Sequence, residues 1–157
     1  MEKYYIAYGS NLNLRQMSYR CPGAKILGTG FIKDYRLLFK GSKTGSYLTI
    51  EKEKGKSVPV AVWKITEEHE KRLDAYEGYP TFYYKQEMEI DVVGIKTQKK
   101  YHKKAFVYIM HEDRKIGIPY PEYVRGCLEG YNTFGFSPRY LEEAIMKSME
   151  AKDGNSK

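Results

Sequence analysis

Near its N-terminus the chain reads Tyr4-Tyr5-Ile6-Ala7-Tyr8-Gly9-Ser10-Asn11-Leu12, and this stretch decides how the fold begins. Residues 4–8 are aromatic or apolar, which predicts a strand. Gly9-Ser10-Asn11 is a cluster of turn-forming residues, and the pattern after it predicts a short helix with Ser10 or Asn11 as its N-cap. Cys21-Pro22-Gly23 ends this helix. We therefore expect a strand that passes through a glycine turn into a helix.

Strands dominate the middle of the chain. The expected strands are residues 24–40, 47–50, 58–65, 82–92 and 100–110. Gly28 and Gly30 indicate a bulge in the first of them. We expect a loop at residues 41–45, a charged turn between the second and third strands, and a turn at Gly94-Ile95-Lys96-Thr97 that makes the last two a hairpin.

Helices are expected on both sides of this hairpin. Thr66 is a good N-cap, and His69, Leu73 and Tyr76 fall on one face of the helix that follows. Gly78 ends that helix. Two more helices are expected near residues 121–132 and 137–152. The class is therefore α+β, with one domain over residues 1–152 and a frayed tail at 153–157.

Composition limits the function classes. The formal net charge is +7, but the lysines gather in Glu51–Lys56 and Lys96–Lys104 among polar residues, as in solvated loops. No signature of a nucleic-acid-binding module is present. The N-terminus is not a signal peptide, and no stretch is long and apolar enough for a membrane helix. With Cys21 and Cys127 as free thiols, the protein is expected to be cytoplasmic, with no nucleic-acid or membrane partner.

A metal site is not expected. His69, His102 and His111 are scattered, without paired ligand spacing. We interpret His69 as a packed, hydrogen-bonded residue and His102 as a solvated one. A Cys–His nucleophile pair has no support from the spacing.

The turn at Gly9 is the first candidate site. Free amides at the start of the following helix, at the positive end of its dipole, can hold an anion or a carboxylate. Gly9 lets a ligand approach the main chain. An ordinary tight turn would use the same residues. Ser10 as a nucleophile is disfavoured, because Leu12 replaces the second glycine of a Gly-x-Ser-x-Gly elbow.

Glu77 is the second candidate. It is expected at the C-terminus of a helix, the negative end of the dipole, with Asp74 three residues before it and aromatic residues around it. All three effects favour the neutral acid and raise the pKa, as a general acid/base near neutral pH requires. The alternative is a solvated residue at a frayed helix end. A pair of carboxylates for sugar chemistry is a further, weaker interpretation.

Together these residues resemble the gamma-glutamylcyclotransferase family. Its hallmarks are a strand running into Tyr-Gly-Ser-Asn-Leu, matched at Tyr8–Leu12, and a helix ending in Leu-Asp-x-x-Glu-Gly, matched at Leu73–Gly78. Val60-Ala61-Val62-Trp63 matches a strand between them, and Tyr108 aligns with a tyrosine on a later strand. Pro121–Tyr123 and Gly135–Tyr140 match the C-terminal part loosely, so the resemblance runs from about residue 4 to about 150.

The resemblance implies a compact mixed β-barrel with flanking helices. It also implies an enzyme without a cofactor that releases 5-oxoproline from a gamma-glutamyl amino acid, peptide or amine. Glu77 is the implied catalytic residue. The implied substrate-binding residues are Tyr8, Gly9, Ser10, Asn11, Leu12, Tyr83, Tyr108 and Tyr140. Residues 41–47 and 79–84 are candidates for the leaving-group pocket.

The alternative to an enzyme is a module of the same fold that only binds a small ligand or a protein. A module of that kind has no reason to keep a carboxylate at an unfavourable helix end, so Glu77 favours the enzyme. The sequence indicates neither the leaving group nor the oligomeric state.

Overall fold

The computed structural model describes residues 2–42 and 45–155. In chain order the elements are β1 (Lys3–Ala7), the 3-10 turn η1 (Ser10–Leu12), α1 (Leu14–Arg20), β2 (Lys25–Ser42), β3 (Gly45–Ile65), α2 (Glu67–Glu77), β4 (Tyr83–Val93), β5 (Lys100–Met110), β6 (Lys115–Ile116), α3 (Pro121–Phe134) and α4 (Arg139–Asn155).

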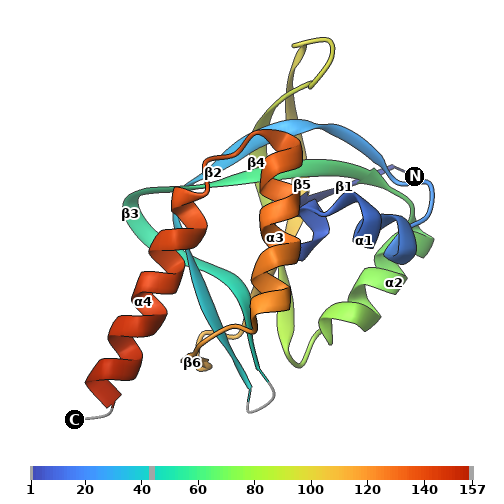
Figure 1. Ribbon diagram of the computed structural model, residues 1–157. Helices are drawn as coiled ribbons and strands as arrows, with labels where there is room; N and C mark the ends of the chain where they lie inside the picture. Colours follow the sequence, from blue (N-terminus) through green and yellow to red (C-terminus); the bar gives the residue numbers. More distant parts are fainter. Residues whose placement is uncertain (1, 43–44, 156–157) are drawn as a thin grey trace.

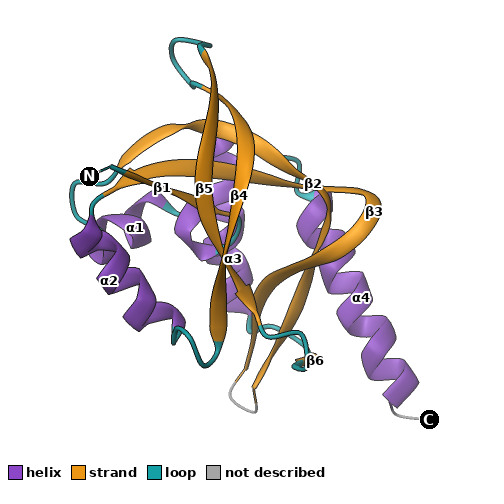
Figure 2. Cartoon of the chain, turned by 180° about the vertical axis from the view of Figure 1, so that it is seen from behind, coloured by secondary structure: helices purple, strands orange, loops and turns teal. Residues whose placement is uncertain are grey.

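The sheet closes on itself. Its strand order is β3-β1-β5-β4-β2-β6, and β2 also pairs with β3, so β1 to β5 form a ring with β6 attached to β2. The pairing of β1 with β5 is parallel and the other pairings are antiparallel. This confirms the α+β class and the mixed barrel, which Figures 1 and 2 show with α1 and α2 on one side and α4 on the other.

Two long strands build most of the barrel. The expected strands at 47–50 and 58–65 belong to one long strand, β3. Its pairing with β2 is interrupted at residues 53–56, which form an irregularity opposite Asp34, between the pairs Tyr35–Lys52 and Lys33–Ser57. Of the expected loop at 41–45, Gly41 and Gly45 lie in strands, and residues 43–44 lie outside the described part of the chain. The register of β2 against β3 shifts between Ile26 and Gly28, where the bulge was expected.

Glycines let β2 cross closely over β4, its neighbour in the barrel. A Cβ atom on Gly28 would lie 2.2 Å from the carbonyl oxygen of Val93, and one on Gly30 would lie 2.4 Å from that of Asp91. Both are closer than real Cβ contacts. In the described part of the chain β2 and β4 pair at Thr29 and Val93, so these glycines let the two strands approach closely enough to close this side of the barrel.

The first segment follows the expected strand–turn–helix order, with one correction. The cap of α1 is neither Ser10 nor Asn11 but Asn13, whose side chain accepts a hydrogen bond from the amide of Gln16 at 3.2 Å. The amides of Leu12 and Asn13 bond back to the carbonyls of Gly9 and Ser10, each at 3.0 Å. These bonds form η1, a tight turn that separates β1 from α1.

The remaining helices begin and end near the expected residues. Thr66 caps α2 through a reciprocal bond with His69, and Gly78 ends it with a φ of 64°. Gly135, with a φ of 72°, ends α3. The helix α4 continues to Asn155, beyond the expected boundary at residue 152. Of the tail expected at 153–157, residues 156–157 lie outside the described part of the chain.

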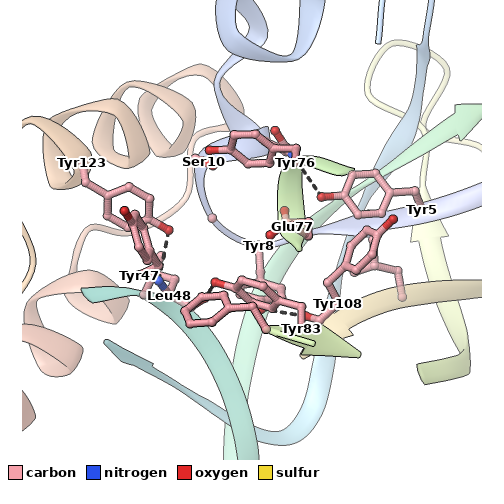
Figure 3. Close-up of a pocket in the computed structure, with 14 residues that line it drawn as sticks. Tyr5, Tyr8, Ser10, Tyr47, Leu48, Tyr76, Glu77, Tyr83, Tyr108 and Tyr123 are labelled. Carbon is pink, nitrogen blue, oxygen red and sulfur yellow. Dashed lines mark hydrogen bonds between the residues drawn. The ribbon is translucent and has the colours of Figure 1, made fainter. Parts of the chain in front are cut away.

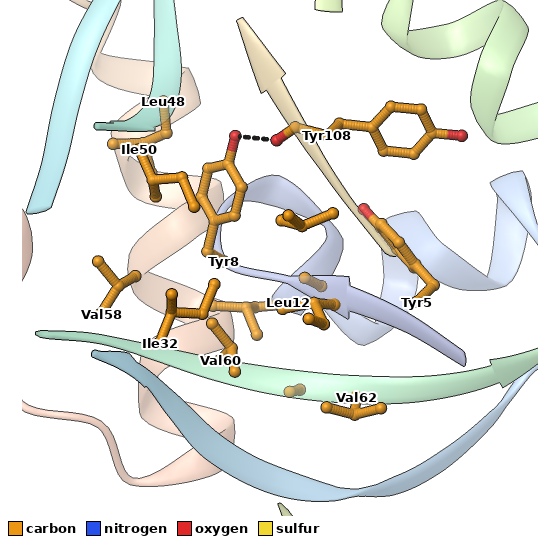
Figure 4. Close-up of a cluster of buried hydrophobic side chains, with 14 of the residues drawn as sticks. Tyr5, Tyr8, Leu12, Ile32, Leu48, Ile50, Val58, Val60, Val62 and Tyr108 are labelled. Atoms are coloured by element: carbon orange, nitrogen blue, oxygen red, sulfur yellow. Dashed lines mark hydrogen bonds between the residues drawn. The ribbon is translucent and has the colours of Figure 1, made fainter. Parts of the chain in front are cut away.

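The core fills the barrel and extends under α2 and α3. Figure 4 shows Tyr5, Tyr8, Leu12, Val60 and Tyr108 among the aliphatic side chains of β2 and β3. Within the described residues, no helix is long and apolar enough to cross a membrane.

Candidate active site

A cavity of about 230 Å³ opens where η1, the end of α2 and the barrel meet. Tyrosines make up half of its lining, and Glu77 is its charged residue (Figure 3). The lining residues are Tyr5, Ile6, Tyr8, Gly9, Ser10, Asn11, Tyr47, Leu48, Tyr76, Glu77, Phe82, Tyr83, Tyr108 and Tyr123. The two sequence candidates, the glycine turn and Glu77, therefore face the same space.

The turn offers fewer amides than expected. The amide of Leu12 is used by Gly9, and the Leu12 side chain is fully buried and does not line the cavity. Among the described residues, the amides of Gly9, Ser10 and Asn11 have no such backbone partner, so they can donate to a ligand. A Cβ on Gly130 of α3 would lie 2.6 Å from the carbonyl carbon of Leu12, so α3 packs directly against the back of the turn.

Hydrogen bonds fix the two polar side chains of the turn. The Asn11 amide group donates to the hydroxyl of Tyr5 at 2.8 Å, and its oxygen accepts from Arg20, so both polar atoms of this side chain have partners within the protein. Arg20 also donates to the Ser10 hydroxyl at 3.1 Å. Because the Ser10 oxygen accepts this bond, its own hydrogen is free for a ligand.

Glu77 is the last residue of α2, one residue before the left-handed Gly78 that turns the chain away. Its carboxyl points into the tyrosine-lined cavity (Figure 3). Burial there raises the pKa of Glu77 from its usual 4.5 to about 7, against an opposite effect from the positive charge of Arg20. At neutral pH the group is therefore poised between base and acid.

Asp74 does not contribute to this shift as expected. The hydroxyl of Tyr108 donates to its carboxylate at 2.6 Å, and Lys85 pairs with it at 2.8 Å. The like-charge repulsion on Glu77 inferred from sequence is therefore wrong, and desolvation is the cause. The interpretation of Asp74 and Glu77 as paired catalytic carboxylates loses its basis for the same reason.

The cavity tyrosines are held by their hydroxyl groups. Tyr8 donates to the carbonyl of Tyr108 at 2.7 Å, and Tyr83 donates to that of Leu48 at 2.9 Å. The hydroxyl of Tyr123 accepts from the Leu48 amide at 3.0 Å. Burial raises the pKa of each of these three phenols well above its usual value, so they stay neutral and line the cavity with fixed dipoles.

Tyr140 lies elsewhere. It is on α4, where its ring packs 6.5 Å from that of Phe31, and it is not among the cavity residues. The loose C-terminal match that suggested it does not reach the site. His69 is a packed residue, bonded through its ring to Thr66 and to the Pro22 carbonyl, and His102 is exposed beside Asp91, both as expected.

Sequence reasoning missed several site residues. Arg20 lies ten residues after Ser10, at the end of α1, and carried no motif signal. Tyr5, Tyr47 and Tyr123 reach the cavity from β1, β3 and α3. Strand alternation does not select Tyr5, because it puts Tyr5 on the face of β1 opposite to Ile6, which also lines the cavity. The other two require knowledge of how α3 lies across the barrel.

Comparison with known proteins identifies the family to which this fold and this site belong. A family model described as "Gamma-glutamyl cyclotransferase, AIG2-like" matches residues 5–125, which contain the turn, Glu77, the end of β1 and the whole of β2 to β5. The chain belongs to this family.

Individual relatives agree. The gamma-glutamylcyclotransferase of Homo sapiens is 28% identical over 160 residues, covering 98% of this chain and 81% of the human protein, and that of Bos taurus matches to the same extent. A solved structure named gamma-glutamyl cyclotransferase superposes with a TM-score of 0.77 at 25% identity, over 92% of this chain and 86% of that one. An uncharacterized Homo sapiens protein gives a TM-score of 0.73 at 26% identity, over 91% and 86% of the two chains.

Proposed function

We propose that the protein is a cyclotransferase that releases 5-oxoproline from a gamma-glutamyl amino acid, peptide or amine, with Glu77 as the acid/base. The observation that carries the proposal is a carboxyl with a pKa of about 7 in the same cavity as the free amides of the Gly9 turn. Membership of the gamma-glutamyl cyclotransferase family supports it.

The substrate contains both reacting groups, an α-ammonium and a γ-amide. Glu77 as carboxylate removes a proton from the ammonium, and the free amine attacks the γ-carbonyl carbon. A new C–N bond closes a five-membered ring, and the C–N bond to the leaving amine breaks. Protonated Glu77 gives this proton to the departing amine. The ring nitrogen still carries an extra proton after the attack, and the Glu77 carboxylate takes it up and passes it to the released amine, so the enzyme ends in its starting state.

The cavity contributes geometry. The attack is intramolecular, so a substrate held in a folded conformation gains much of its rate from orientation. The amides of Gly9, Ser10 and Asn11, with the Ser10 hydroxyl, are donors for the substrate carboxylate or for the oxyanion that develops on the γ-carbonyl.

We place the leaving group at the aromatic end of the cavity. Tyr47 and Phe82 stand edge to face with ring centroids 6.4 Å apart, and Tyr123 packs 5.2 Å from Tyr47. Phe82, from residues 79–84, and Tyr47, from residues 41–47, both line the cavity, which supports this placement. Aromatic walls accept apolar stems and amines through their faces.

The test is release of 5-oxoproline from a panel of gamma-glutamyl amino acids, peptides and amines by the wild type and by Glu77→Gln. Glutamine keeps the size of the side chain and removes the base. We expect turnover by the wild type to rise with pH through about 7 and kcat to fall by about a hundredfold or more in Glu77→Gln.

The matched control is Glu67→Gln, at the other end of α2 and outside the cavity. It should turn over like the wild type. A folded wild type that releases 5-oxoproline from no member of the panel would contradict the proposal, and turnover that survives Glu77→Gln would remove Glu77 from the mechanism.

A further inference from the structure

Arg20, the last residue of α1, joins the two halves of the site from outside the cavity. One guanidinium nitrogen donates to the hydroxyl of Ser10 at 3.1 Å and to the side-chain oxygen of Asn11. The other donates to Gln16 at 2.9 Å and to the hydroxyl of Tyr76. Its Cζ atom lies 3.6 Å from the centroid of the Tyr76 ring.

This position matters because Tyr76 directly precedes Glu77. One planar group thus connects the substrate turn, on one wall of the cavity, with the end of the helix that carries the acid/base on the other. The fork of an arginine can serve both sides at once, while a lysine has a single nitrogen to share.

Arg20 is also the charge that acts on Glu77. The groups that face Glu77 from the other elements are Tyr5, Tyr8, Tyr83, Tyr108 and Tyr123, from β1, β4, β5, α3 and the segment after β1. The pKa of each of these tyrosines is raised, so they are neutral. For Glu77 the effects are burial and the positive charge of Arg20, which lowers its pKa.

We propose that Arg20 is a positioning residue that locks the Ser10–Asn11 turn to the end of α2 and supplies the positive charge which keeps Glu77 available as a base. It orients Ser10 as a hydrogen-bond donor toward the cavity and holds Tyr76 beside Glu77. It touches neither substrate nor reacting atoms. The kinetic part of this inference rests on the proposed function, while its electrostatic part does not.

Two substitutions of Arg20 separate the effect of its two-nitrogen hydrogen-bonding geometry from the effect of its positive charge. Arg20→Lys keeps the positive charge and loses the bidentate geometry, and Arg20→Gln loses both. Arg15→Gln is the matched control, because Arg15 is an exposed arginine on the same helix whose partner is Glu129, away from the cavity. Thermal unfolding of each variant establishes that it is folded.

The first measurement is the titration of Glu77 by carbon-13 NMR of protein labelled at its glutamate carboxyls, with Glu77→Gln assigning the signal. In Arg20→Gln we expect the midpoint to rise by about half a pH unit or more, since loss of a nearby positive charge favours the neutral acid. In Arg20→Lys and Arg15→Gln it should stay at the wild-type value. No turnover is needed, so this result stands whatever the reaction is.

The second measurement is KM for the best gamma-glutamyl substrate of the panel. We expect it to rise by about tenfold in both Arg20 variants, since each loses the bonds that fix the turn, and to be unchanged in Arg15→Gln. If Arg20→Gln has the same Glu77 titration midpoint and the same KM as Arg15→Gln, the inference is overturned. An equal rise of the Glu77 midpoint in Arg20→Lys and Arg20→Gln would overturn the role of the charge. A wild type without turnover would overturn the proposed function and the kinetic part alone.

Discussion

At the residue scale, ionisation of the buried Glu77 lowers the free energy of unfolding. Its pKa is about 7 in the folded protein and 4.5 when solvated, so folding favours the neutral acid. Below pH 4.5 the group is neutral in both states and has no cost. As the pH rises from 4.5 through about 7 the cost develops, and above 7 it is constant at up to roughly 3 kcal/mol.

Glu77→Gln should therefore stabilise the protein at pH 8 and leave its stability unchanged at pH 4. Denaturant unfolding of wild type and variant at both pH values measures the difference. Glu67→Gln, near the start of α2, is the control for loss of a negative charge. An equal effect of Glu77→Gln at pH 4 and pH 8 would show that the carboxyl is not desolvated.

Some residues of the site could be predicted from the sequence and others could not, depending on whether a residue carries a local signal. Gly9, Ser10 and Glu77 carry local signals, a turn and an unfavourable helix end, and they lie together in the cavity. The cause of the raised pKa of Glu77 could not be predicted from the sequence. Whether Asp74 faces Glu77 or Tyr108 depends on how α2 lies on the barrel, which helical spacing does not contain.

At the element scale, the contact of α3 with η1 fixes the substrate turn. The side-chain amide of Asn13 donates to the Gly126 carbonyl at 3.0 Å and to Glu129 at 2.8 Å. A Cβ on Gly130 would approach the Leu12 carbonyl carbon and Cβ to 2.6 Å, with backbone on one side and no space to yield.

Gly130→Ala should accordingly push η1 and α3 apart. We expect a loss of about 1–3 kcal/mol in unfolding free energy and a raised KM for the gamma-glutamyl substrate, with the Glu77 titration little changed. Gly135→Ala is no fair control, because its positive φ strains any side chain. Thr133→Ala on the same helix is suitable, since its hydroxyl bonds only within α3. If Gly130→Ala has the stability and the KM of the wild type, the conformation of the turn does not depend on the contact between Gly130 and Leu12.

Elements themselves were predictable to the extent that their signals are local. The caps at Thr66 and Gly78 gave α2 almost to the residue. The division of β3 into two strands was wrong because its charged segment, residues 51–56, has the composition of a turn. Its first residues continue the strand by pairing with β2, as at Arg36 with Glu51, and residues 53–56 are an irregularity within it, opposite Asp34. Pairing between distant residues is not readable from composition.

At the scale of the whole molecule, the barrel and α2 are held together by a polar network on the outer side of the cavity wall. Lys85 of β4 binds Asp74 at 2.8 Å and Glu70 at 2.7 Å, and Glu70 also binds Lys3 of β1. Tyr108 of β5 donates to Asp74 at 2.6 Å. Three strands therefore fasten the helix whose last residue is Glu77.

Asp74→Ala removes the centre of this network. It leaves Lys85 with Glu70 alone and the Tyr108 hydroxyl without its acceptor, so we expect a loss of about 1–3 kcal/mol in unfolding free energy. Because α2 is loosened at the turn before Glu77, kcat should fall more than KM rises. Glu67→Ala, in the exposed first turn of the helix, is the control for loss of an acidic residue from α2. Equal stability and kinetics of the two variants would mean that packing alone seats α2. A fall in kcat only for Asp74→Ala would show that the barrel positions the acid/base through this network.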